Sequence, residues 1–288
     1  METTPVDDRQ AWRKHAGFIA WPTVLFFLVT FAGWVAVAAL AWQGRLGLGV
    51  AFILQTIAAY LLFTPMHEAS HGNVAGKDKR LKTVEKLVGW LSGVSLLAPY
   101  PAFRKLHLEH HGHTNDHEKD PDFWVAGPSR WAVLWRCATI LPHYYWRIFI
   151  GAIRSPHARD VASIGALLGY VALAAAIALV GHGAWVLMVW VGPALMATAV
   201  LAFVFDWLPH QPHTSRERYK NSRILLFPGL GVLLTNQNLH LIHHLYPRIP
   251  FYRYGTFFRE ARSALRAKGA PIVDLAKRGG DAEVPGKV

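Results

Sequence analysis

Four uncharged apolar segments constrain this chain of 288 residues more than any other feature of its sequence. They cover residues 18–42, 47–66, 161–180 and 184–205. An α-helix rises about 1.5 Å per residue, so about 20 such residues cross a hydrocarbon layer roughly 30 Å thick. Residues 43–46 join the first two segments and residues 181–183 join the last two, and links this short allow only a tight turn. The sequence therefore predicts an all-α integral membrane protein with four transmembrane helices in two hairpins.

Composition agrees with a membrane protein and excludes several other classes. Hydrophobic residues make up 52% of the chain and charged residues only 17%, whereas a soluble domain is about one quarter charged. The 12% of aromatic residues argues against a disordered chain. Cys137 is the only cysteine in the sequence. A disulfide framework, an iron–sulfur cluster and a zinc ribbon are therefore excluded within one chain.

Lysine and arginine are distributed unevenly around the four segments. Residues 1–17 hold 3 of them, residues 72–160 hold 13 and residues 206–288 hold 13, whereas the two short links hold only Arg45. Positively charged segments of membrane proteins stay in the cytoplasm. We therefore expect both termini and a histidine-rich helical cap on the cytoplasmic side of the cytoplasmic membrane. The net charge of +12 then reflects this bias and contact with anionic lipid, and no nucleic-acid partner is expected.

Three further apolar segments are expected to be re-entrant or interfacial and not to span the membrane: residues 87–103, 131–153 and 224–239. A single crossing by the first of them would place the histidine groups that flank it on opposite sides of the membrane. We expect residues 1–288 to form a single domain, with a polar C-terminal tail that is mobile from about Lys268.

Nine of the 16 histidines form a distinct set, and all nine lie in segments or at helix ends that are expected at the cytoplasmic side. Three groups and one single residue make up this set: His67 and His71; His107, His110 and His111; His240, His243 and His244; and His210. Helix positions i, i+3 and i+4 share a face, so each group can direct its imidazoles to one site. Metal binding is the commonest use of so many imidazoles, and four or five nitrogens suffice for one ion. The set therefore predicts two ions, although imidazole alone does not separate zinc, copper and iron.

Two other uses of these histidines remain open at this point. The segment from His67 to His71 also fits the helix-borne zinc pair of metalloproteases, in which the glutamate, here Glu68, activates water. Such an intramembrane protease would leave most of the other histidines unexplained. The second alternative is a metal carrier or channel without catalysis.

The three histidine groups resemble the histidine boxes of the membrane-bound fatty acid desaturase and hydroxylase superfamily. The resemblance extends over residues 60–254 and is closest to bacterial carotenoid ring hydroxylases of the desaturase-like type. It is carried by FDWLPHQP at residues 205–212, NQNLHLIHHLYP at residues 236–247, IPFYRY at residues 249–254, Asn115 with Asp116, and the Asp120, Pro121 and Asp122 triplet.

This resemblance implies a non-haem di-iron centre that splits dioxygen, with all nine histidines as iron ligands. Asp206 stands where the superfamily tends to keep an asparagine that acts on the metal or its water. Asp206, Glu68 and Asn115 are therefore the candidate catalytic residues. The side chains that could orient the ligand rings are Glu68, Asn73, Glu109, Asn115, Asp116 and His213.

The expected reaction is hydroxylation of a lipophilic substrate, most simply a carotenoid ring. The alternative is desaturation of a fatty acyl chain, because both outcomes use the same ligands and differ in how the substrate is placed. The sequence has no glycine fingerprint for a dinucleotide and no cysteine set for an iron–sulfur cluster. Electrons must then come from a separate donor, and we expect an acidic ferredoxin that docks on the basic cytoplasmic face.

Overall fold

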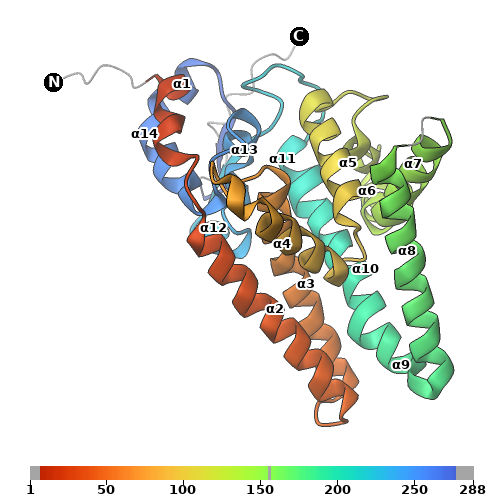
Figure 1. Ribbon diagram of the computed structural model, residues 1–288. Coiled ribbons are helices and arrows are strands. Elements are labelled where there is room, and N and C mark those ends of the chain that lie inside the picture. Colours follow the sequence, from red (N-terminus) through yellow and green to blue (C-terminus); the bar gives the residue numbers. More distant parts are fainter. Residues whose placement is uncertain (1–6, 155–156, 277–288) are drawn as a thin grey trace.

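The computed structural model describes residues 7–154 and 157–276, and helices make up nearly all of its regular structure (Figure 1). The α-helices are α1 Asp8–Ala11, α2 Trp21–Trp42, α3 Leu48–Ser70, α4 Lys82–Ser95, α5 Tyr100–His113, α6 Arg130–Ala138, α7 Ile140–Arg154, α8 Ala158–Ile177, α9 Gly183–Trp185, α10 Gly192–Leu201, α11 Leu208–His210, α12 Leu230–Leu233, α13 His240–Leu245 and α14 Tyr254–Ala267. Short 3-10 or π-helical segments adjoin several of them. The strands are β1 Ile224–Leu226 and β2 Ile272–Asp274, which pair in parallel.

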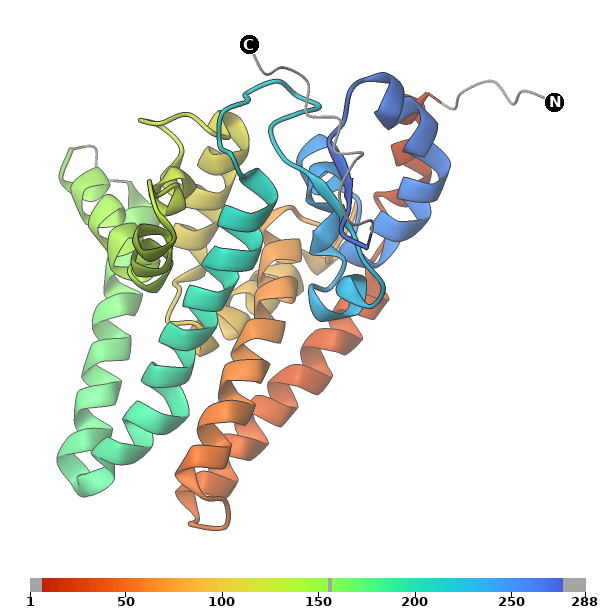
Figure 2. The ribbon, with the colours of Figure 1, turned by 180° about the vertical axis from the view of Figure 1, so that it is seen from behind.

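Three helical runs within the described residues are long and apolar enough to cross a membrane: Trp21–Trp42, Leu48–Ser70 and Ala158–His210. The third run combines the two predicted segments 161–180 and 184–205 and is bent between them. Val180 and Gly181 leave helical geometry there, and Gly181 has a φ of +95°, which glycine adopts without steric cost. Figures 1 and 2 show the chain turning back at this bend, so that α8 and α10 form two arms.

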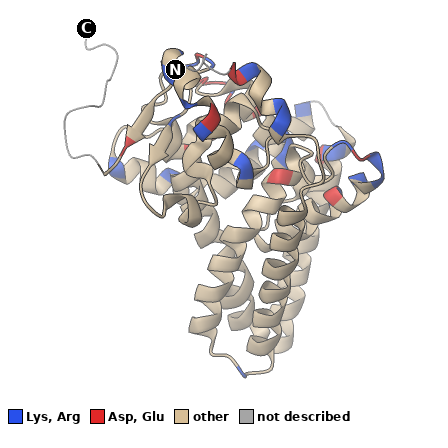
Figure 3. Cartoon of the chain, turned by 90° about the vertical axis from the view of Figure 1, so that its left-hand side faces the viewer, with Lys and Arg blue, Asp and Glu red and all other residues tan. Residues whose placement is uncertain are grey.

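We call the long helices α2, α3, α8 and the run from α9 to α10 the stem, and the other described elements, together with the end of α3, the cap. The stem presents apolar side chains outward. Leu28, Ile53 and Leu168 are among the exposed large hydrophobic residues. Figure 3 shows that the charged residues gather in the cap, while the stem is almost free of them. Exposed apolar surface of this extent is stable when lipid, not water, surrounds it. At the far end of the stem the ring of His182 stacks on Trp42, with the centroids 4.0 Å apart, so the two arms and the α2–α3 hairpin touch there.

The cap contains the three segments that we expected to lie outside the bilayer core, and none of them is among the candidate spans of the described chain. Residues 87–103 form the end of α4, a turn and the start of α5. Residues 131–153 form most of α6 and α7, on which Trp135 and Trp146 are exposed. Amphipathic helices with exposed tryptophans suit the membrane interface.

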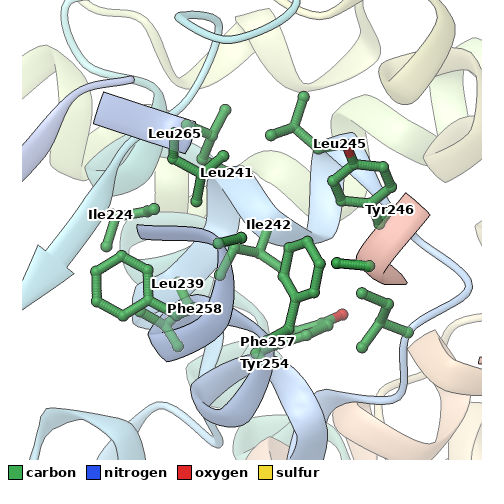
Figure 4. Packing of buried hydrophobic residues seen from close by; sticks show 13 residues of the cluster. Ile224, Leu239, Leu241, Ile242, Leu245, Tyr246, Tyr254, Phe257, Phe258 and Leu265 are labelled. Atoms are coloured by element: carbon green, nitrogen blue, oxygen red, sulfur yellow. The ribbon is translucent and has the colours of Figure 1, made fainter. Parts of the chain in front are cut away.

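A hydrophobic core beside the histidine groups fixes α13 against α14 (Figure 4). On α13, Leu241, Ile242 and Leu245 point into this core, and the three histidines occupy the remaining face. On α14, Phe257 and Leu265 are fully buried in the same core. Burial of a large apolar side chain contributes about 1.5–3 kcal/mol. The apolar face of α13 therefore determines where its histidines point.

The tail that we expected to be mobile from about Lys268 is packed over part of its length. Lys268 forms an ion pair with Asp8, whose carboxylate also accepts hydrogen bonds from Tyr219 and Tyr246. Further on, Ile272 and its neighbours in β2 pair with β1. Residues 268–274 thus have partners, a buried carboxylate and the edge of β1, that the polar tail sequence alone does not reveal. Residues 277–288 lie outside the described residues.

Candidate metal centre

The ends of four helices bring the nine predicted histidines together. The C-terminal end of α3 supplies His67 and is followed directly by His71. From α5 come His107, His110 and His111, α11 ends at His210, and α13 carries His240, His243 and His244. Most of these side chains are buried, and His67 and His243 are 1% and 0% exposed. Because the helices converge in the cap, residues 176 positions apart along the chain come into contact.

The first cluster contains His67, His71, His107 and His243, whose ligand atoms all lie within 4.8 Å of one another. The Nε2 atoms of His67 and His243 are 3.0 Å apart, and those of His71 and His107 are 2.7 Å apart. His111 joins this cluster, since its Nε2 lies 2.8 Å from that of His243. Five imidazoles from α3, α5 and α13 thus surround one point.

The second cluster contains His110, His210, His240 and His244, again within 4.8 Å of one another. The Nε2 atoms of His110 and His244 are 3.3 Å apart. The rings of His111 and His244 stack with centroids 4.4 Å apart, so the two clusters adjoin. The structure therefore brings all nine histidines into two neighbouring groups.

These two groups fit a pair of first-row metal ions. Two nitrogens that each lie about 2.1 Å from one ion, at right angles, are about 3 Å apart, which matches the observed spacing. The Nε2 atom of His210 is buried in the second cluster without a hydrogen-bond partner, as expected of an atom that awaits a metal. Burial holds the pKa values of His71, His107, His240 and His244 well below the usual range, so these rings are neutral and able to bind metal.

Hydrogen bonds at Nδ1 orient five of the nine imidazoles. In each of them Nδ1 meets an oxygen of another residue, which leaves Nε2 for the centre of its cluster. The pairs are His110 with Asp120 at 2.9 Å, His210 with the Asn221 carbonyl at 2.9 Å, His243 with Tyr254 at 3.0 Å, His240 with Gln237 at 3.3 Å and His244 with Thr114 at 3.3 Å. Such contacts fix the tautomer and the direction of each ring.

The strongest of these contacts is made by a buried carboxylate. His110 Nδ1 donates to Asp120 at 2.9 Å, and Asp122 lies 3.3 Å from the same nitrogen. Burial alone would lower the pKa of His110, but the two carboxylates outweigh it and raise that pKa to about 9. The backbone N–H groups of Asn115 and Asp122 also donate to Asp120. Asp120 is thus held rigidly against the second cluster.

The three predicted catalytic residues occupy different places. Asp206 lines the cavity that reaches the histidines. The Asn115 amide donates to the carbonyls of Ser215 and Asn221, and the Asn221 carbonyl in turn orients His210. Glu68 is fully buried and accepts from Asn73 at 3.3 Å.

The remaining predicted orienting residues lie around the site and not in it. Asn73 also donates to the Pro247 carbonyl beyond α13. Asp116 forms an ion pair with Arg216 at 3.0 Å. Glu109 is half-buried on α5, and His213 is buried with its ring centroid 6.3 Å from that of His210.

An apolar cavity inside the molecule reaches both clusters. It runs between α3, α5, α7 and α10, where Phe63, Phe103, Leu141 and Leu201 line it. Its inner end is formed by His67, His107, His110 and His240, together with Asp122, Asp206 and Tyr144. The Tyr144 hydroxyl donates to Asp122 at 2.6 Å. A long apolar molecule could therefore place one carbon beside the imidazoles while the rest of it stays away from water.

Sequence reasoning missed most of the residues that orient the rings. Asp120 had a signal, because it lies in the acidic triplet that follows the second histidine group. Gln237 also had one, since it precedes His240 by one helical turn. Tyr254 and Asn221 had none, because their contacts depend on how α14 and the segment after α11 fold back onto the cluster.

Comparison with known proteins identifies the family of this chain. A fatty acid desaturase family model matches residues 43–276. A beta-carotene ketolase of Paracoccus sp. (strain PC1) is 30% identical over 202 residues, which are 67% of this chain and 71% of the relative. A chloroplastic omega-6 fatty acid desaturase of Brassica napus is 24% identical and is matched over 96% of this chain and 65% of the relative. A 12-desaturase for sn-1 oleoyl lipids from Picosynechococcus sp. is 27% identical over 81% of this chain and 74% of its own length. These matches show that the chain is an oxidoreductase of the fatty acid desaturase family.

Proposed function

We propose that this protein oxidises a C–H bond of a carotenoid ring with dioxygen, using two iron ions that the nine histidines hold. The observation that carries the proposal is the meeting of two all-imidazole clusters at the inner end of an apolar cavity. The relative named a beta-carotene ketolase supports a carotenoid as the substrate class. Hydroxylation is the simplest outcome, and a second oxidation of the same carbon would give a ketone.

We also propose that the protein crosses the cytoplasmic membrane four times. The α2–α3 hairpin supplies two crossings, and the arms on either side of the bend at Gly181 supply two more. The cap, both termini and the histidine clusters then lie in the cytoplasm. The distribution of lysine and arginine supports this orientation, because Arg45 is the only one of these residues in the turns at the far end of the stem.

Different residues of the chain would have different roles in such an oxidation. When bound, the two iron ions would supply dioxygen activation and the removal of a hydrogen atom from the substrate. Histidines provide neutral ligands, and the Nδ1 contacts hold their rings in place. Asp206 and Asp122 lie at the boundary between the histidines and the apolar cavity. There they could donate a proton to the second oxygen atom of dioxygen, which is released as water with electrons from the donor protein.

The cavity walls determine which carbon reacts. Phe63 contacts the ring of His67, and Phe103 stacks on His107 with centroids 5.4 Å apart. These aromatic side chains exclude water from the metal face and confine an apolar substrate. Because hydroxylation and desaturation differ in how the substrate carbon is placed, small changes in this wall would alter the product.

The second candidate is desaturation of a fatty acyl chain. The similarity to the omega-6 and oleoyl-lipid desaturases supports it, and a flexible acyl chain would also fit an apolar cavity. The zinc-protease alternative loses its basis in this site, since Glu68 is hydrogen-bonded to Asn73 and both clusters use histidines that a protease would not need.

We propose that electrons arrive from a separate acidic ferredoxin. A polar open cleft in the cap is lined by Arg130, Arg136 and Arg147, and it reaches Asp120 and His213 next to the second cluster. Opposite charges would steer an acidic donor to this cleft. The turnover rate with purified reduced ferredoxin should therefore fall as salt is added, and a rate that does not change with ionic strength would argue against this donor site.

Product analysis in a bacterial host that accumulates β-carotene tests the proposed reaction. New hydroxylated or oxo carotenoids would support the first candidate, and new double bonds in membrane acyl chains would support the second. Metal analysis of the purified protein should find about two iron ions per chain, as nine imidazoles suffice for two ions. Zinc without iron, or neither product, would contradict the proposal.

A further inference from the structure

A second apolar groove lies on the outer surface of the molecule between α7 and α8. Phe149 of α7 and Leu168 and Val171 of α8 line it, and these three side chains are 50%, 64% and 64% exposed. Among the described residues that line this groove, none is charged. Such a groove is unfavourable in water and favourable against lipid chains.

This outer groove and the inner cavity share part of one wall. Pro99, Tyr145 and Ile148 line both of them. Ile148 is buried, Tyr145 is half-buried, and the inner cavity continues from this wall to the histidines. Only a layer one side chain thick therefore separates the lipid-facing surface from the space beside the clusters.

The groove lies at membrane depth, below the polar edge of the cap. Lys105 and Asp160, at the start of α8, form an ion pair at 3.0 Å that marks this edge. The groove extends along α8 as far as Val171, eleven residues beyond Asp160. With a rise of about 1.5 Å per residue, that position is roughly 16 Å deeper along the helix. The opening therefore faces acyl chains and not the cytoplasm.

One hydrogen bond holds Tyr145 in place between the outer groove and the inner cavity. The Tyr145 hydroxyl of α7 donates to the Leu97 carbonyl, in the link between α4 and α5, at 2.5 Å. The bond joins the two sides of the wall, and rotation of this one side chain would break it. The phenol can lose this partner at modest cost, because a neutral hydrogen bond contributes about 1 kcal/mol net.

We propose that the lipophilic substrate enters sideways from the membrane, through the groove between α7 and α8, with Tyr145 as the gate. This inference rests on the proposed function for the identity of the substrate, an elongated apolar molecule dissolved in the bilayer. A polar cleft lined by Arg130, Arg136 and Arg147 also opens near the second cluster, and its charges do not suit such a molecule.

Blocking the groove after the protein has folded tests the portal without disturbing assembly. Leu168→Cys and Leu173→Cys would each be made in a Cys137→Ser background, labelled in detergent solution with a bulky lipophilic maleimide, and then returned to lipid vesicles. Both side chains are exposed on α8, but Leu173 does not line the groove, so it is the matched control. The readout is the amount of β-carotene, or of phospholipid with a radiolabelled oleoyl chain, that is retained by the purified protein after incubation in vesicles.

The label on position 168 should reduce retention of the bound probe about tenfold, while the label on position 173 leaves it unchanged. Tyr145→Phe should speed loading of the same probe, because the ring remains and the closing bond is lost. The proposed portal would be overturned if the two labelled proteins retained equal amounts of probe, whether high or low. It would also be overturned if the unlabelled protein retained neither probe. Retention does not depend on turnover, so a portal that works in a protein forming no oxidised product would refute the proposed function and not the route.

Discussion

The ring of His110 is held at both nitrogens, with Asp120 at Nδ1 and the second cluster at Nε2. Because the carboxylates raise the pKa of His110 to about 9, the metal-free ring carries a proton below that pH. A metal ion at Nε2 must displace this proton, so the affinity for iron should fall as the pH is lowered through 9 and should be insensitive to it above.

Replacement of Asp120 tests its two effects on His110, which are to raise the pKa of the ring and to fix the direction of the ring. Asp120→Asn should shift the pH dependence of iron binding to lower pH without removing it, because Asp122 remains 3.3 Å from the ring nitrogen. It should also weaken binding about 10- to 100-fold at pH 9, because the ring loses its orienting partner. Competition with an iron chelator between roughly pH 7 and 9 measures both quantities. An unchanged pH dependence in the variant would show that another group takes up the proton.

A second change at the residue scale removes a ligand. His110→Ala should abolish turnover and reduce bound iron, since the second cluster would lose one of its four imidazoles. The matched control is His113→Ala on the same helix, whose side chain lies outside both clusters. Iron content and product formation are measured on protein extracted from the membrane, and full activity of the His110 variant would remove that residue from the ligand set.

At the scale of elements, close packing of α4 against α5 positions the second histidine group. A Cβ atom on Gly89 of α4 would lie 2.4 Å from the Tyr100 ring at the start of α5. Gly89→Ala should therefore displace α5 and destabilise the protein by about 1–3 kcal/mol, with a loss of bound iron. Gly169→Ala on α8 is the control, because nothing lies within 4 Å of its added carbon. Thermal unfolding in detergent, followed together with iron content, distinguishes the two.

The elements also show what the sequence could and could not reveal. Apolar length predicted α2, α3 and the bent run from Ala158 to His210, and helical spacing predicted which histidines share a face. The core of α13 and α14 and the packed tail escaped prediction, because they depend on contacts between residues far apart, such as Asp8 with Lys268. The same reason hid Tyr254 and Asn221, whereas the histidines that they orient were evident from local spacing.

For the whole molecule, the charge distribution predicts how the protein is oriented. Gln43 lies in the exposed turn at the far end of the stem, and Lys79 is exposed in the cap. In a Cys137→Ser background, Gln43→Cys should react with a membrane-impermeant maleimide added to intact cells, and Lys79→Cys should react only after lysis. The reverse pattern would place the histidine clusters outside the cell and exclude a cytoplasmic electron donor.

Both clusters need histidines from α13, which follows every candidate span along the chain. During synthesis the ribosome therefore delivers all the hydrophobic helices to the bilayer before either group of ligands is complete. Metallation has to follow insertion, and the apoprotein must persist in the membrane until iron reaches it. A cell short of iron would consequently accumulate inserted, inactive enzyme that later iron could activate without new translation.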